Sequence, residues 1–118
     1  MKYKAKVTGI GDSAFELFEA CNSLVIFNDN APAELAEISI LHTIENFKEN
    51  IAVGDKLILG NQTYIITSIG DEAIHTLKEM GHCTLKFSED EEVDLPGQIA
   101  LKGSSSPDVN VGDIIAFV

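Results

Sequence analysis

The chain has 118 residues, of which 45% are hydrophobic, a size and composition typical of one globular domain with a buried core. Nineteen acidic residues against eight basic ones give a formal net charge of -11, which disfavours nucleic acid and anionic lipid as partners because Lys and Arg bind phosphates. No apolar segment is long enough for a membrane span, and the N-terminus has no continuous apolar stretch of a signal peptide, so we expect a cytoplasmic protein without direct membrane insertion.

The first half of the chain predicts a strand, a short helix and three further strands. The alternating residues 3–10 (YKAKVTGI) lead into Gly11-Asp12, where the Asp12 carboxylate can cap a helix. In that helix Ala14, Leu17 and Phe18 share one face, which we expect to be buried. The remaining strands of this half, with a turn at 28–30, are predicted at 23–27 (SLVIF), 38–43 (ISILHT) and 56–60 (KLILG).

The second half predicts the same succession. Asp71 is placed to cap a helix whose buried face carries Ala73, Leu77 and Met80. The acidic residues 88–92 predict a turn. Strands are predicted at 62–69 (QTYIITSI), 82–87 (HCTLKF), 97–103 (GQIALKG) and 113–118 (DIIAFV).

The two halves are related by an internal repeat. Residues 8–14 (TGIGDSA) match residues 67–73 (TSIGDEA), and Val-Gly-Asp at 53–55 returns at 111–113 in the same order. We therefore expect a single domain, 1–118, built from two similar halves, roughly 3–60 and 62–118. The fold class is mainly β, a small closed or nearly closed barrel with one short helix in each half, because many short strands need closure to hide their edges. A flattened sandwich is the alternative.

Two histidines depart from the repeat and are candidate functional residues. His42 ends a predicted strand, and its counterpart in the second half is Ala100 or Leu101; His82 corresponds to Ser23 or Leu24. His42 shares its strand face with isoleucines, so it is either a functional imidazole or a core histidine bonded to a backbone carbonyl. His82 shares its face with Thr84 and Lys86 and can equally be an exposed strand residue. His75, on the polar side of its helix, is expected to be solvated.

A sheltered imidazole can accept a phosphoryl group, act as a base or bind a metal, because an apolar environment favours the neutral ring. The histidine spacing shows no metal motif, and the two cysteines, Cys21 and Cys83, lack the paired spacing of a zinc site and are expected to be free thiols. GxSxG, P-loop and GxGxxG patterns are absent from the sequence. No metal or other cofactor is therefore expected, and phosphoryl acceptance remains open.

A family resemblance narrows these alternatives. The segment ITSIGDEAIHTLKEMGHCTLKF at 66–87, the stretch APAEL at 31–35, the strand end Ile40-Leu41-His42 and the late Leu95-Pro96-Gly97 occur in this order. In nearly its whole length the chain resembles the glucitol/sorbitol-specific enzyme IIA component of the bacterial phosphoenolpyruvate-dependent sugar phosphotransferase system. The resemblance implies a small closed barrel.

The resemblance also implies a phosphotransferase mechanism. The family's phosphohistidine lies at the end of the strand that matches ISILH, so His42 would accept a phosphoryl group from the histidine-containing phosphocarrier protein. It would pass the group to the IIB component of the sorbitol permease during glucitol/sorbitol uptake. The IIC component of that permease is the other expected partner. A family member has a second histidine where this chain has Ile44, which makes His82 the candidate for stabilising the phosphoryl group. Weaker candidates for support are Thr43, Thr84 and Lys86.

Two other functions stay open at this point. The first is a non-catalytic barrel that binds or regulates a partner, in which His42 would be a sheltered structural residue. The second is a small metal- or base-dependent enzyme that uses His42 and His82 with a carboxylate. The oligomeric state and the hexitol transported do not follow from the sequence.

Overall fold

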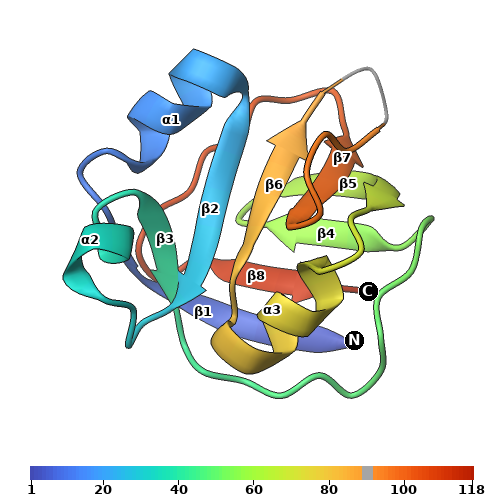
Figure 1. The fold of residues 1–118 in the computed structure, drawn as a ribbon, viewed down its shortest axis with the longest axis horizontal. Coiled ribbons are helices and arrows are strands. Elements are labelled where there is room, and N and C mark those ends of the chain that lie inside the picture. Colours follow the sequence, from blue (N-terminus) through green and yellow to red (C-terminus); the bar gives the residue numbers. More distant parts are fainter. Residues whose placement is uncertain (89–91) are drawn as a thin grey trace.

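The structure is a computed structural model, and it describes residues 1–88 and 92–118. The described residues form eight strands that close into a barrel, with helices at its ends (Figure 1). The elements of the first half are β1 (Tyr3–Ile10), α1 (Ala14–Cys21), β2 (Ser23–Asn28), α2 (Ala33–Ala36), β3 (Ser39–His42) and β4 (Lys56–Leu59). Those of the second half are β5 (Gln62–Ile69), α3 (Ala73–Met80), β6 (Cys83–Phe87), β7 (Gln98–Lys102) and β8 (Ile114–Phe117).

The order of the strands around the barrel is β1-β3-β2-β6-β7-β5-β4-β8. Replacing each strand by its counterpart in the other half (β1 by β5, β3 by β7, β2 by β6, β4 by β8) reproduces the same neighbours, with the cyclic order read in the opposite direction. The pairs β2–β3 and β6–β7 are parallel, and all other neighbours are antiparallel. The mainly β barrel of two similar halves predicted from the sequence is thus confirmed.

Strand register repeats between the halves as well. In β1–β3, Val7 lies opposite His42 and a bulge follows before Gly9. In β5–β7, Ile66 lies opposite Leu101 and the same bulge follows before Ser68. The register therefore identifies Leu101, rather than Ala100, as the counterpart of His42.

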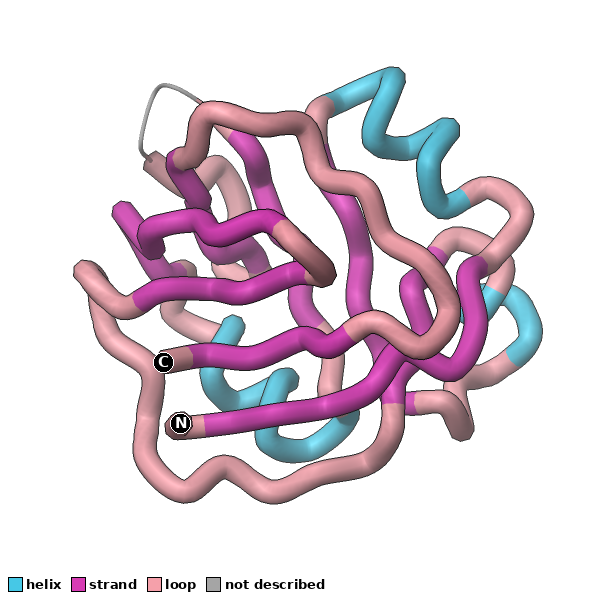
Figure 2. Tube along the Cα trace, turned by 180° about the vertical axis from the view of Figure 1, so that it is seen from behind, coloured by secondary structure: helices cyan, strands magenta, loops and turns pink. Residues whose placement is uncertain are grey.

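The core fills the barrel with inward-facing side chains and is closed at both ends by helices and loops. Leu24 and Ile26 of β2 and Leu85 of β6 belong to this core, as do Ala14 of α1 and Leu77 of α3. Ile51 and Val109, at matching places in the loops before β4 and β8, are buried in the same cluster. The two termini lie side by side on one flank, where the backbone N–H of Lys2 donates to the carbonyl of Phe117 (Figure 2).

Three expectations about the helices need correction. Asp12 and Asp71 do not cap them: the N-cap residues are Ser13 and Glu72, and neither makes a side-chain cap bond. The backbone carbonyls of Glu37 and Pro96 instead accept the N–H groups of these two N-cap residues.

The other two corrections concern helical faces and helix number. Met80 is 40% exposed, because the buried face of α3 ends at Leu77 before the chain turns into β6. The four-residue α2 adds a second helix to the first half. The acidic turn predicted at 88–92 lies partly outside the described residues. No helix among the residues that the structure describes is long and apolar enough to span a membrane.

Candidate functional site

His42 is the last residue of β3, and its side chain points into the end of the barrel, where the residue has no exposed surface. Both ring nitrogens face backbone carbonyls: Nδ1 lies 2.9 Å from the oxygen of Thr43 and Nε2 lies 2.8 Å from the oxygen of Gly81. The hydroxyl of Tyr3 lies 3.4 Å from Nδ1. The imidazole is therefore held at both of its polar ends.

The two carbonyl contacts of the His42 ring need two N–H donors, one more than a neutral imidazole has. A neutral imidazole carries one N–H, whereas both carbonyls can only accept hydrogen bonds. Both contacts are hydrogen bonds only in the doubly protonated ring; in the neutral ring one nitrogen turns a lone pair toward a carbonyl oxygen. One of the two contacts is thus unfavourable whenever the ring is nucleophilic.

Tyr3 and Cys83 supply the side chains next to His42. The Tyr3 ring stacks on Phe47, with centroids 4.3 Å apart, and meets the His42 ring edge-on. Burial, with the negative charge of Glu45 adding to it, raises the pKa of Tyr3 to about 12, so its hydroxyl remains a donor at neutral pH. Burial also raises the pKa of the Cys83 thiol, which makes it an unreactive apolar group.

Asn28 and Gly81 complete the site and were not identified from the sequence. Asn28 is the strand neighbour of His42 in the parallel β2–β3 pair. Gly81 ends α3 in the left-handed conformation, with φ of +62°. A Cβ atom at Gly81 would overlap the Asn28 amide oxygen and lie 2.6 Å from His42 Cε1, so glycine provides the space for both side chains. Only the strand register brings these residues together.

His82 follows Gly81 directly, but its ring lies on the other face of the sheet. Cys83 and Leu85 of β6 point into the core, so the side chain of His82 points outward. Its ring packs on Phe27, with centroids 4.6 Å apart, and its Nδ1 lies 3.2 Å from the carbonyl oxygen of Ile26. The structure therefore brings His82 next to the Gly81 peptide rather than to the His42 ring.

The structure places the three weaker candidates as follows. The Thr43 hydroxyl accepts the N–H of Lys6, and the Thr43 N–H donates to the Lys6 carbonyl, so only its carbonyl contacts His42. Thr84 pairs with Val25. Lys86 lies opposite Ser23, the first residue of β2, whereas His42 lies beside Asn28, the last residue of that strand. The Nζ atom of Lys86 contacts the Glu92 carbonyl and the Asp94 carboxylate. Neither Thr84 nor Lys86 is brought to the His42 ring.

His75 lies on the exposed side of α3, with its Nε2 3.7 Å from a Glu79 carboxylate oxygen. In the part of the chain that the structure describes, His, Cys, Asp and Glu side chains form no group of three or more that could hold a metal ion. His42 and His82, on opposite faces of the sheet, are not arranged as ligands of one ion.

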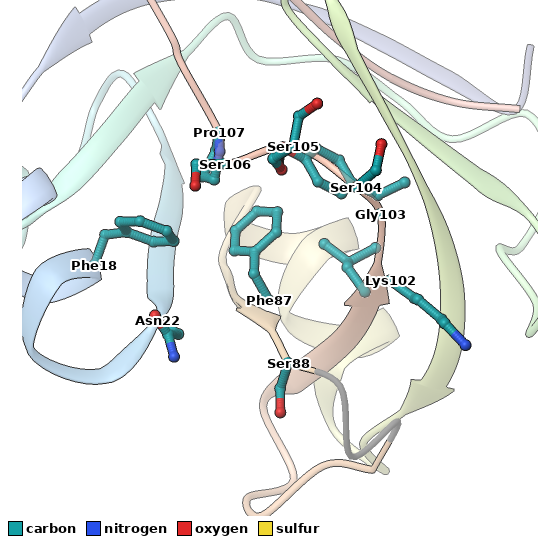
Figure 3. A pocket seen from close by; sticks show the side chains of 12 residues that line it. Phe18, Asn22, Phe87, Ser88, Lys102, Gly103, Ser104, Ser105, Ser106 and Pro107 are labelled. Carbon is teal, nitrogen blue, oxygen red and sulfur yellow. Dashed lines mark hydrogen bonds between the residues drawn. The ribbon is translucent and has the colours of Figure 1, made fainter.

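The matching place in the second half is a pocket at the other end of the barrel, lined by both apolar and polar residues. Leu101 stands there in place of His42, Phe87 in place of Asn28, and Asn22 in place of Gly81. The pocket has a volume of about 220 Å³, and Phe18 and Phe87 line it opposite the loop of Ser104, Ser105 and Ser106 (Figure 3). The barrel therefore does not require a histidine and an asparagine at these two strand positions, which Leu101 and Phe87 can occupy.

The fold and the site define a class of protein, a small barrel of two similar halves with a buried histidine site in one half only. A sequence model of the family described as PTS system glucitol/sorbitol-specific IIA component, where PTS denotes the sugar phosphotransferase system, matches residues 2–116. The chain belongs to this family, which confirms the resemblance seen in its motifs.

Individual relatives agree with the family match. The PTS system glucitol/sorbitol-specific EIIA components of Escherichia coli (strain K12) and Shigella flexneri are each 31% identical over 115 residues, which make up 98% of this chain and 93% of each relative. The crystal structure of the PTS system IIA component from Enterococcus faecalis V583 is similar with a TM-score of 0.86 at 26% identity, covering 98% of this chain and 99% of that one.

Proposed function

We propose that this chain is a phosphocarrier of the sugar phosphotransferase system, a phosphotransferase component with a phosphohistidine intermediate. It accepts a phosphoryl group on His42 from the histidine-containing phosphocarrier protein and passes it to the IIB component during glucitol/sorbitol uptake. Membership of the glucitol/sorbitol-specific IIA family over residues 2–116 supports this role.

The observation that carries the assignment to His42 is the asymmetry between the two halves. The same backbone positions hold His42 and Asn28 in the first half and Leu101 and Phe87 in the second. Because the fold accepts apolar residues at these two positions, a functional role explains His42 and Asn28 better than a requirement of folding does. His75 and His82 have no comparable polar surroundings inside the barrel.

The surroundings of the ring favour Nε2 as the acceptor atom. Thr43 is the next residue in the chain, so its carbonyl has a locally fixed position and can hold the proton on Nδ1. The carbonyl in front of Nε2 belongs to Gly81, at the end of a helix. Because His42 is completely buried, the Gly81 peptide has to move away from Nε2 before a phosphoryl group can reach it. His82, which anchors the adjacent residue on Phe27, is then a positioning residue for this cover.

The transfer step balances without a net proton transfer. The lone pair of His42 Nε2 forms the new P–N bond, while the P–N bond of the carrier's phosphohistidine breaks and its electron pair stays on the carrier's imidazole. The proton stays on Nδ1 of His42, which donates it in a hydrogen bond to the Thr43 carbonyl. Phosphoryl transfer needs chiefly positioning and stabilisation of charge, which a fixed ring and neutral donors can supply.

A second candidate function follows from the burial of His42. A ring with no exposed surface and a carbonyl at each nitrogen is also what a structural histidine requires in a barrel that only binds a partner. This alternative predicts that the chain takes up no phosphoryl group.

The deciding experiment incubates the protein with phosphoenolpyruvate, enzyme I and the histidine-containing carrier. We expect one phosphoryl group per chain, in a linkage that is labile in acid and stable in base, on a peptide containing His42. His42→Gln, which keeps an amide donor for the Gly81 carbonyl, should fold and take up none. His75→Gln and His82→Gln are the matched controls and should remain labelled. A label on His75 or His82, or no label on the wild-type protein, contradicts the proposal.

A further inference from the structure

The Asn28 side chain is a buried amide without a protein partner. Asn28 is 7% exposed, and within residues 1–88 and 92–118 its amide makes no hydrogen bond. No fully buried side-chain nitrogen or oxygen among these residues lacks a hydrogen-bond partner, so the amide atoms of Asn28 must keep contact with solvent. The site therefore holds a polar group that is almost enclosed and still able to bind something that enters.

The backbone fixes this amide beside the imidazole. Asn28 pairs with His42, and the N–H of Asp29 donates to the His42 carbonyl at 2.8 Å. On the other side, the antiparallel register of β2 and β6 continues to Gly81, which leaves room for the amide because it has no side chain. Asn28 thus lies on β2, between the strand that ends at His42 and the strand that follows Gly81, and its amide oxygen and His42 Cε1 both pack against Gly81, whose peptide covers Nε2.

We propose that Asn28 is a catalytic residue that donates a side-chain N–H to a phosphoryl oxygen on His42. The inference rests on the proposed phosphorylation of His42. When the Gly81 peptide moves aside, the Asn28 amide is the polar side chain next to the new P–N bond. A half-turn of the amide exchanges its oxygen and nitrogen and brings the two N–H donors toward the phosphoryl group. The amide gains and loses no proton in the step.

A neutral donor suits a carrier that must release its phosphoryl group again. A lysine or arginine would form a charge-assisted bond to the phosphoryl oxygens and hold them more tightly, whereas an amide stabilises the developing charge without adding a cation. The counterpart of Asn28 in the second half is Phe87, which lines the pocket there. At this strand position the amide donor is therefore present only in the half that has the histidine.

The test compares initial rates of phosphoryl transfer from the carrier protein to three variants. Asn28→Ala should lower the maximal rate by about 10²–10³-fold, as expected for the loss of one donor, with little change in the carrier concentration that gives half the maximal rate. Asn28→Asp, which has the same shape but a negative charge and no donor, should be at least as slow. Gln98→Glu makes the same amide-to-carboxylate change at a buried residue whose Oε1 only accepts backbone N–H groups, and it should transfer at the wild-type rate.

Spectroscopy on the wild-type protein supplies a readout that does not depend on folding of a variant. In the ¹⁵N-labelled protein, phosphorylation should shift the Asn28 side-chain NH₂ resonances downfield, while those of Gln98 stay in place. Unmoved Asn28 resonances, or wild-type transfer by either Asn28 variant, would overturn the role of Asn28 and leave the phosphorylation of His42 standing. An unlabelled wild-type protein would instead remove the proposed function itself.

Discussion

His82 is held on the outside of the barrel by a ring contact with Phe27 and a hydrogen bond to the Ile26 carbonyl. Its substitution by alanine should remove both and lower the free energy of unfolding by about 1–2 kcal/mol. Phosphoryl transfer should fall by less than about tenfold, because the N–H of Gly81 still donates to Leu77 and holds the peptide that faces His42. Urea unfolding and initial transfer rates measure the two effects.

His82→Phe is the matched control for this substitution, since it keeps the stacking on Phe27 and loses only the hydrogen bond. It should recover most of the lost stability. A loss of transfer by 10²-fold or more in both variants, at little cost in stability, would show that the His82 ring itself reaches the phosphoryl group.

The site residues differ in how far the sequence could identify them. His42 was proposed from the sequence because it ends an apolar strand, breaks the repeat and matches the family's active-site strand, and all three signals are contained in the sequence. Asn28 breaks the repeat as well, against Phe87, but its role depends on the β2–β3 register, which a single sequence does not specify. Lys86 and Thr84 share a strand face with His82, but β6 runs away from Gly81, so proximity in sequence was a poor guide to proximity in the fold.

At the scale of elements, the ends of the two long helices can be compared directly. Gly81 and its counterpart Asn22 both adopt the left-handed conformation, with φ of +62° and +55°. The backbone therefore tolerates asparagine at this kind of helix end. What excludes a side chain at Gly81 is the packing of Asn28 and His42 against it.

An exchange of these residues tests this explanation. Gly81→Asn should lower the free energy of unfolding by about 1–3 kcal/mol, the usual range for overpacking, and should slow phosphorylation because it displaces the Asn28 amide and the His42 ring. Asn22→Gly, at the helix end without such packing, should cost less than about 1 kcal/mol and leave transfer unchanged. If Gly81→Asn cost less than about 1 kcal/mol and left transfer unchanged, the packing of Asn28 and His42 would not be what requires glycine at this position.

The strands were predictable because they alternate and repeat, whereas the helix details were not. Four residues of α2 are too few to show a helical period, and α2 follows Pro32 without a side-chain cap. The Gly-Asp pairs before α1 and α3 suggested carboxylate caps. At Gly11 and Gly70, however, the backbone of a distant segment packs so closely that the carbonyls of Glu37 and Pro96 accept the N–H groups of the N-cap residues instead. Contacts of this kind depend on segments distant in sequence.

At the scale of the whole molecule, burial of titratable groups predicts sensitivity to alkali. Burial raises the pKa of Tyr3 from its ordinary value of 10.0 to about 12, and it raises the pKa of Cys83 above its ordinary value of 9.0. The unfolded chain releases these protons at lower pH than the folded chain, so the contribution of Tyr3 and Cys83 to the free energy of unfolding should be constant below about pH 9 and decrease as the pH rises toward 12.

Urea unfolding at a series of pH values measures this dependence. Tyr3→Phe keeps the ring that stacks on Phe47, and should reduce the decrease between pH 10 and 12, whereas Cys83→Ala should reduce the part that begins near pH 9. A free energy of unfolding that stays level up to pH 11 would contradict the burial of both groups.

The position of β4 has a consequence for the origin of the barrel. β4 pairs with β5 and β8, and β8 pairs with β4 and β1, so neither strand pairs within its own half. The last strand of each half thus pairs with strands of the other half, as the exchanged strand does in a domain-swapped homodimer with two-fold symmetry. An ancestral polypeptide of about half this length could have built the barrel from two identical copies. Fusion of the copies would then have freed one of two equivalent histidine sites to become the pocket around Leu101, without the histidine.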